Sequence, residues 1–200
     1  MSTELVAGLV GIAIFLLIVM LLYNKLVRLR YAVRSSWSDI DVHLRKRYEL
    51  VPNLVETVQG YAAHERDTLS QITGFRAAAM KAETPGEKAK AENGLTATLR
   101  TLFAVVENYP TLKADGQFQD LMKQMRELED NIEYARRYYN ASARDYNVKT
   151  GVFPSKIVAG ACSFTPVEFF ELDDPQRERR PVKVAFARSG GAADPAPRAN

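Results

Sequence analysis

The sequence predicts an all-α protein in which an N-terminal transmembrane helix continues into a long antiparallel bundle of three to four helices. Three observations support this fold class. Residues 5–23 form an apolar run without any charge. The long segments that follow repeat apolar residues every three or four positions, which is the period of an amphipathic helix. Proline and glycine, which interrupt helices, are absent between Gly11 and Pro52, so one rod is expected to leave the membrane and enter the bundle.

Residues 5–23 read LVAGLVGIAIFLLIVMLLY. At about 1.5 Å per residue this run spans roughly 28 Å, enough to cross a bilayer core. A cleaved signal peptide is disfavoured because the residues before the run carry no Lys or Arg and no small-residue cleavage site follows it. A buried hairpin helix is disfavoured because the run is apolar on every face. Residues 1–4 are therefore predicted to form a short extracytoplasmic N-terminus.

Four basic residues follow the span before the first acidic one, Asp39: Lys25, Arg28, Arg30 and Arg34. By the positive-inside rule, the domain after the span is predicted to lie in the cytoplasm and the N-terminus on the opposite side of the membrane. The same four side chains are predicted to lie close to anionic lipid headgroups. The formal net charge of +3 gives no nucleic-acid footprint, and no nucleic-acid partner is expected.

The first amphipathic stretch repeats apolar residues at steps of three and four: Leu26, Leu29, Val33, Trp37, Ile40, Leu44, Tyr48 and Val51. Pro52 interrupts this pattern, which resumes at Leu54 and continues to Ile72. Proline removes one backbone donor and crowds the carbonyl four residues earlier, so a kink is favoured there. The alternative is a reversal at Pro52, which would give four helices of comparable length instead of one very long helix with shorter partners.

The next helix has a clear start. Thr84 is a good N-cap, Pro85 fits the first helical position, and Glu87 can complete a capping box. Pro110 is predicted to end this helix, and Asp115 is a candidate N-cap for the next one. The apolar face between these points consists of Leu95, Leu99, Leu102, Val106 and Tyr109.

The last long helix has the most regular apolar seam: Phe118, Leu121, Met125, Leu128, Ile132, Ala135, Tyr139, Ala143 and Tyr146. Such heptad-like spacing is typical of coiled-coil packing near +20°, and we expect it to favour self-association as well. Gly151 is predicted to take a left-handed conformation at the C-terminal end, before Phe153 and Pro154 stop the helix.

The C-terminal part changes character. Residues 154–161 can form one or two helical turns, whereas residues 164–172 and 181–186 read as extended segments lying along the bundle. The bundle with its extended segment is thus predicted to cover residues 24–186. Residues 187–200 are rich in Gly, Ala and Pro and are predicted to form a disordered tail.

Several motifs occur in a fixed order along the chain. The first runs from Trp37 through Asp41 to Pro52, Asn53 and Leu54. The later motifs contain Tyr109, Pro110, Arg136, Tyr139, Asn140, Asn147, Phe153 and Pro154. Together, over about residues 5–186, they resemble the LemA family of bacterial membrane proteins.

The resemblance implies an N-terminal span and an antiparallel helical bundle in the cytoplasm. It implies no established enzymatic activity. Some family members are associated with a membrane zinc metalloprotease of the HtpX type, and a relative acts in magnetosome membrane formation.

No catalytic, cofactor-binding or metal site is expected from the residues. Neither His43 nor His64 belongs to a Glu-x-x-His pair of a di-metal bundle or to a zinc-protease helix. No phosphate-binding glycine loop is present.

Two sets of polar residues are interpreted mainly as structural. The tyrosine-rich end, Tyr134, Tyr138, Tyr139 and Tyr146, is either a docking surface or bundle core, and core is favoured for Tyr139 and Tyr146. Arg136, Asn140 and Asn147 are predicted to satisfy buried polar groups near Pro52 and Asn53 or near Tyr109 and Pro110.

The sequence-based hypothesis is a membrane scaffold, not an enzyme. It is expected to contact lipid and to form a homo-oligomer that organises membrane proteins or membrane regions. The alternative is an adaptor or regulatory subunit of a membrane zinc metalloprotease of the HtpX type in membrane-protein quality control.

Overall fold

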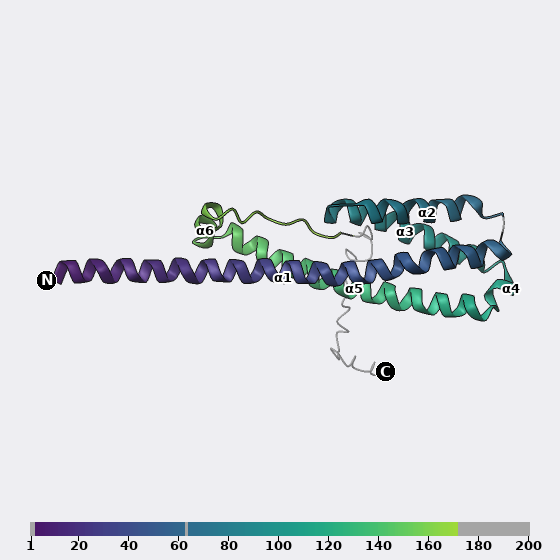
Figure 1. The fold of residues 1–200 in the computed structure, drawn as a ribbon, viewed down its shortest axis with the longest axis horizontal. Coiled ribbons are helices and arrows are strands. Elements are labelled where there is room, and N and C mark those ends of the chain that lie inside the picture. Colours follow the sequence, from purple (N-terminus) through teal and green to yellow (C-terminus); the bar gives the residue numbers. More distant parts are fainter. Residues whose placement is uncertain (1–2, 63, 172–200) are drawn as a thin grey trace, which may run out of the picture.

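The computed structural model describes residues 3–62 and 64–171. Its elements are α1 (Thr3–Tyr61), α2 (Arg66–Lys81), α3 (Pro85–Val106), α4 (Pro110–Lys113), α5 (Gly116–Gly151) and α6 (Ser155–Ala161). The four longer helices α1, α2, α3 and α5 alternate in direction, and α1 projects far beyond the other three at its N-terminal end (Figure 1). The predicted all-α bundle is confirmed, and the described ranges contain no strand.

The chain does not reverse at Pro52, because α1 is one helix from the apolar run to Tyr61. The missing N–H of Pro52 leaves the carbonyl of Tyr48, four residues earlier, without its usual helical donor. Arg76 of α2 replaces that donor, with its Nε 2.7 Å from the Tyr48 carbonyl oxygen. The proline is thus accommodated inside the helix, and the carbonyl it frees binds α2.

The reversal occurs ten residues later than the proline suggested, between Tyr61 and Arg66. The apolar pattern through Ile72 was predicted to belong to the same stretch as Leu54, and this was wrong. Ala62, Leu69 and Ile72 are all buried, as the pattern required. Spacing alone did not reveal the break because two helices that face the same core continue the same period.

Helix caps follow the predicted chemistry. Thr84 Oγ1 accepts a hydrogen bond from the Glu87 N–H at 3.2 Å, and the Glu87 carboxylate accepts one from the Thr84 N–H at 3.3 Å, completing the capping box. Asp115 Oδ1 caps α5 through the Phe118 N–H at 2.8 Å. Pro110, predicted only to end a helix, is also the first residue of α4, since the preceding helix stops at Val106.

The core runs along α1, which packs against α5 on one side and against α2 and α3 on another. Every residue of the predicted seam on α5 is buried, from Phe118 to Tyr146. This burial confirms the predicted seam. It also means that the seam serves packing within the chain and not the self-association that its spacing suggested. It packs inside one chain against α1, so it is not a free surface for association between chains.

The end of α5 differs from the prediction. Gly151 does not take a left-handed conformation, and none of the glycines in the described part of the chain has a positive φ. The chain leaves α5 through Val152 in an extended conformation. Ser155 Oγ lies 2.6 Å from the Lys149 carbonyl oxygen and 3.0 Å from that of Val152. These contacts satisfy the helix terminus, so no left-handed residue is needed there.

After α6, residues 164–171 run in an extended conformation from α6 toward the turn between α2 and α3 (Figure 1). We call this stretch the extended segment. The short helix and the extended path were both predicted. The predictions for residues 181–186 and 187–200 lie outside the described residues.

Candidate functional site

The side of α1 that faces the extended segment carries an aromatic cluster centred on Trp37. The Trp37 ring centroid lies 5.2 Å from that of Tyr139 on α5 and 5.6 Å from that of Phe170 on the extended segment. The ammonium of Lys88 lies 5.8 Å from the Trp37 ring, within cation–π range. One indole therefore joins α1, α3, α5 and the extended segment.

Two asparagines of α5 hold the backbone of the extended segment. Asn147 Nδ2 donates to the Val167 carbonyl oxygen and its Oδ1 accepts from the Val167 N–H, both at 2.9 Å. Asn140 makes the same pair with Phe170, at 3.1 and 2.9 Å. Each amide thus plays the part of a neighbouring β-strand, supplying one donor and one acceptor to a single residue.

The spacing of this clamp follows from elementary geometry. Asn140 and Asn147 are two helical turns apart, about 10.5 Å along α5. Val167 and Phe170 are three extended residues apart, about 10 Å. The two repeats match, so both amides engage when the segment lies antiparallel to α5. Between Val167 and Phe170, the Glu168 carbonyl oxygen accepts a hydrogen bond from the Tyr139 hydroxyl at 2.7 Å. Burial, with the nearby charge of Glu168, raises the pKa of Tyr139, which keeps this donor protonated.

Charged contacts connect the same region to α3. Asp41 accepts from Lys88 at 2.8 Å and from Arg45, four residues along α1, at 2.6 Å. Partial burial acts to raise the pKa of Asp41, but the two cations outweigh it and the pKa is lowered. Glu168 of the extended segment accepts from the backbone N–H of Gly86 in the first turn of α3, at 3.2 Å.

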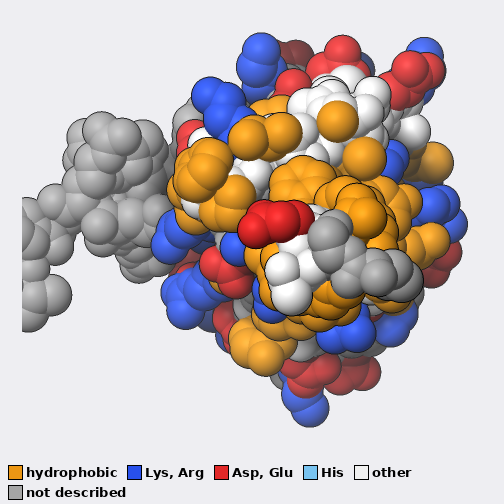
Figure 2. Space-filling model, turned by 90° about the vertical axis from the view of Figure 1, so that its left-hand side faces the viewer, with side chains coloured by type: hydrophobic (Ala, Val, Ile, Leu, Met, Phe, Trp, Pro, Cys, Tyr) orange, Lys and Arg blue, Asp and Glu red, His pale blue; other side chains and the backbone are white. Residues whose placement is uncertain are grey.

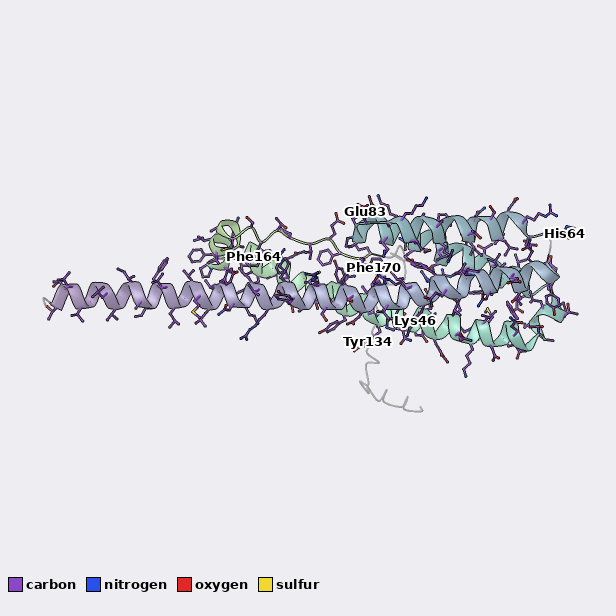
Figure 3. The ribbon with its side chains drawn as sticks, in the orientation of Figure 1. Lys46, His64, Glu83, Tyr134, Phe164 and Phe170 are labelled. Carbon is purple, nitrogen blue, oxygen red and sulfur yellow. The ribbon has the colours of Figure 1, made fainter. Side chains whose placement is uncertain are left out.

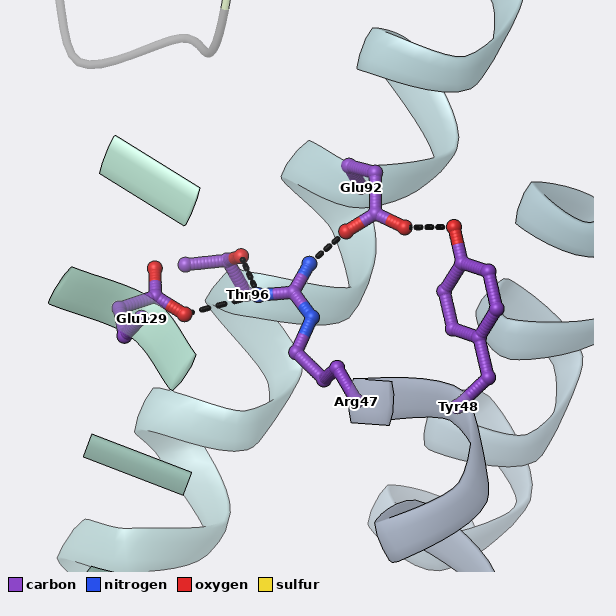
Figure 4. A network of polar contacts seen from close by, with 5 residues as sticks. All are labelled: Arg47, Tyr48, Glu92, Thr96 and Glu129. Atoms are coloured by element: carbon purple, nitrogen blue, oxygen red, sulfur yellow. Dashed lines mark hydrogen bonds and ion pairs between the residues drawn. The ribbon is translucent and has the colours of Figure 1, made fainter. Parts of the chain in front are cut away.

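Further from the apolar span, a polar network lies between α1, α3 and α5, and it is buried except for the partly exposed Glu129 and Thr96 (Figure 4). Arg47 and Glu92 are completely buried and form an ion pair, and the Tyr48 hydroxyl donates to the other oxygen of Glu92. Arg47 Nη1 also contacts Glu129 of α5 at 2.8 Å and Thr96 of α3 at 3.2 Å. One guanidinium therefore links three helices.

The environment of this network shifts two of its pKa values. Burial lowers the pKa of Arg47, and the negative charge of Glu129 acts in the opposite direction. Burial raises the pKa of Tyr48 to about 12, although Arg47 opposes the shift. The arrangement keeps Tyr48 neutral, so its hydroxyl can donate a hydrogen bond to Glu92 and help to hold α1 and α3 together.

Sequence reasoning did not single out Arg47, Glu92 or Glu129, although a signal existed. Arg47 falls three residues after Leu44, on the buried stripe of α1, and Glu92 falls three residues before Leu95, on the buried stripe of α3. A charge on an apolar stripe needs a partner from another element because an unpaired buried charge is costly.

No metal site is apparent: within residues 3–62 and 64–171, no group of three or more His, Cys, Asp or Glu side chains is placed to hold a metal ion. One helix in that part of the chain, α1, is long and apolar enough to cross a membrane, and none of its most apolar window is buried. The apolar end of α1 is thus a candidate membrane anchor.

Comparison with known proteins agrees with the motifs of the sequence. The sequence model of the LemA family matches residues 36–186. The chain belongs to the LemA family. It is similar to the magnetosome protein MamQ 2 of Paramagnetospirillum magneticum, with 25% identity over 193 residues, covering 84% of this chain and 71% of that protein. It is also similar to MamQ of Magnetospirillum gryphiswaldense, with 24% identity over 192 residues, covering 83% and 71%. Protein LemA of Metamycoplasma hominis is 25% identical over 158 residues, covering 77% and 71%.

The structure brings five of the LemA motif residues into one region: Trp37, Asp41, Tyr139, Asn140 and Asn147. The two asparagines were predicted to satisfy buried polar groups near Pro52 and Asn53 or near Tyr109 and Pro110, and that location was wrong. They bind the extended segment, which comes after them in the chain. Sequence spacing did not reveal this partner because no periodic pattern relates a helix to an extended segment that packs along it.

The other motif residues lie apart from that region. Pro52 and Asn53 are exposed on α1, and Leu54 beside them is fully buried. Tyr109 precedes α4 at the far end of the bundle, half-buried, and Pro110 follows it.

The remaining predicted site residues lie on α5, in the turn after it, and on α1. Arg136 is half-buried on α5, and Phe153 and Pro154 are exposed at the turn into α6. Of the basic residues after the span, Lys25, Arg28, Arg30 and Arg34, all are exposed. The Arg30 guanidinium also lies 5.9 Å from the Phe164 ring.

Proposed function

We propose that this LemA-family protein is a single-pass scaffold of the bacterial inner membrane, with its N-terminus outside and its bundle in the cytoplasm. It self-assembles to organise membrane proteins or membrane regions. The observation that carries the proposal is the continuity of α1 from the apolar run to Tyr61. A bundle built on the same helix as its anchor is joined to that anchor without a flexible linker and stays close to the bilayer, as a scaffold requires.

Self-assembly needs a free surface, and the buried seam of α5 does not supply one. The exposed tyrosines of α5 do: Tyr134 is 76% exposed and Tyr138, one turn later, is 55% exposed. We call this pair the tyrosine face. Tyr134 and Lys46 lie on the side of the bundle opposite Phe164 and Phe170 (Figure 3). Large, amphipathic tyrosine rings are typical anchors of protein interfaces.

The similarity to proteins named as magnetosome proteins supports a role connected with a specialised membrane region.

Unlike the tyrosine face, Tyr139 and Tyr146 are buried and belong to the core. The two exposed tyrosines are therefore the ones available for docking.

The test is gentle extraction of the full-length protein from native membranes, followed by measurement of the mass and composition of the particle. The proposal predicts a large assembly made of this chain alone. The double variant Tyr134→Ser, Tyr138→Ser should reduce its mass, whereas Met80→Ser, an exposed apolar residue of α2, should leave it unchanged.

Two results contradict the scaffold. A monomer at high concentration in several mild detergents rules out self-assembly. A small complex of fixed stoichiometry with a second membrane protein, such as a zinc metalloprotease, favours the adaptor function instead.

A further inference from the structure

The end of the bundle that carries α6 lies beside the last turn of the apolar run. Phe164, directly after α6, packs its ring edge-on against Tyr23, with 5.7 Å between the ring centroids. Val19 and Leu22, inside the apolar run, are partly buried against the same core. The helix α6 is therefore level with the end of the candidate span instead of lying beyond it (Figure 1).

Two faces of this end differ in burial. Toward α1 and α5, Ser155, Val158 and Ala159 of α6 are buried. The outward side carries four large apolar side chains, which we call the apolar foot: Val148, Val152, Phe153 and Ile157. Phe153 is 81% exposed and Ile157 is 66% exposed.

Such exposure is unusual on a surface that faces water, and here it coincides with the level at which the anchor leaves its apolar run. Lys149 lies within the foot and Lys156 beside it, and Lys25 and Arg28 follow the run on α1. Apolar side chains mixed with lysines are typical of elements that lie in the bilayer interface. Seen along α1 from its N-terminus, this end of the molecule presents hydrophobic side chains around the helix axis, with charged side chains further out (Figure 2).

We propose that the apolar foot is a second membrane contact, which inserts Phe153 and Ile157 into the boundary between headgroups and acyl chains. Lys149 and Lys156 then lie at the level of the lipid phosphates. The occupant of this surface is the bilayer itself, because Phe164, three residues after the helix that carries Ile157, contacts the span at Tyr23 and so holds the foot beside the end of the span. This inference rests on α1 spanning the membrane, and it is independent of self-assembly.

The contact has a mechanical consequence. A single helix can tilt and rotate in a bilayer, whereas a helix with a foot docked beside it is held at two points. Because Phe164 and the asparagine clamp connect the foot to α1 and α5, the bilayer would fix the orientation of the whole bundle.

The experiment places one fluorescent label at a time in the full-length protein, reconstituted in vesicles that contain lipids brominated near the headgroup end of the acyl chain. The native Cys162, the only cysteine in the chain, is first replaced by serine. Labels are then introduced through Ile157→Cys in the foot, Leu16→Cys in the span and Ser70→Cys on the exposed surface of α2. All three positions are exposed, and circular dichroism checks that each labelled variant keeps its helix content.

The proposal predicts that the label at residue 157 loses most of its emission in brominated vesicles, as does the label at residue 16, whereas the label at residue 70 loses none. Quenching at residue 16 without quenching at residue 157 overturns the foot and leaves the anchor intact. Quenching at neither position overturns both the foot and the membrane anchor. A second label, through Phe153→Cys, must agree with residue 157, since a foot that inserts must quench both.

Discussion

Near the anchor, the bundle holds its extended segment with neutral groups: two asparagine amides, one tyrosine hydroxyl and the rings around Trp37. Farther along, α1 holds the α2–α3 hairpin with charges: Arg47 between Glu92 and Glu129, and Arg76 on the carbonyl freed by Pro52. The two regions fix different things. The amides, each paired with one backbone residue, fix the position of the extended segment along α5. A fork-shaped guanidinium fixes the mutual orientation of helices.

The difference also predicts how each region fails. A buried ion pair that loses one partner leaves an uncompensated charge in the core, so damage there affects the whole fold. An amide clamp that loses its side chain frees backbone groups that water can reach, so damage there stays local. The five predictions below test this contrast, beginning with the largest effect.

Glu92→Gln should destabilise the fold by removing the buried ion pair between α1 and α3. It keeps the shape of the side chain but leaves the buried Arg47 without its fully buried counter-charge. The expected loss is about 3–5 kcal/mol in the free energy of unfolding. Denaturant unfolding of the detergent-solubilised protein, followed by circular dichroism, measures it. The matched control is Glu133→Gln, which removes an exposed pair with Arg137 and should cost under about 0.5 kcal/mol.

The charge itself can be separated from the packing by the double variant Arg47→Met, Glu92→Met. With both charges removed, no ion is left uncompensated, so the double variant should lose less stability than Glu92→Gln alone. A larger loss in the double variant would show that the ion pair stabilises the fold beyond its own desolvation cost.

Alkaline pH should weaken the same region through Tyr48. Its pKa in the folded protein is raised from 10.0 to about 12. The folded state therefore retains a proton that the unfolded state loses between these values, and stability present below pH 10 is lost as the pH rises toward 12. The loss should reach about 2–3 kcal/mol. Unfolding free energies measured across this range test it, and Tyr48→Phe should flatten the slope. An unchanged slope in that variant would assign the effect to other tyrosines.

Asn147→Ala should break the neutral region locally. It removes two hydrogen bonds to Val167, with an expected cost of about 1–2 kcal/mol. Hydrogen exchange should accelerate at the Val167 amide and much less at amides of α3. The exposed Asn131→Ala on the same helix is the control. Acceleration spread evenly over the whole bundle would contradict the separation of the two regions.

Asp41→Asn tests the junction between the regions, and its effect should be the smallest. Asp41 is paired with Lys88 but partly exposed, so the cost should be under about 1 kcal/mol. Because its folded-state pKa is lowered below 3.8, its contribution is present above pH 3.8 and is lost as the pH falls through the folded-state value. The variant and the wild type should therefore converge in stability in acid.

Much of the fold could be predicted because the buried side of a helix is set by residues only three or four positions apart in the sequence. The seam on α5, the capping box at Thr84, the cap at Asp115 and the short helix before residue 162 all followed from spacing or from single side chains. The turn after Tyr61 was missed because the apolar period passes through it unchanged. Gly151 was misjudged because a serine four residues later supplies what a left-handed residue usually provides.

The sequence by itself determined the apolar run, the continuity of α1 as far as Pro52, the family and the faces that each helix buries, since these depend on residues within a few turns of one another. That α1 continues through Pro52 to Tyr61 came from the structure. Only the tertiary structure decided which polar groups meet. The guanidinium of Arg47 meets Glu92 and Glu129 across separations of 45 and 82 residues in the chain. The amide of Asn147 meets Val167 because an extended segment returns along the helix. Such pairings depend on how whole elements pack, and the three- and four-residue spacing within a helix carries no information about them.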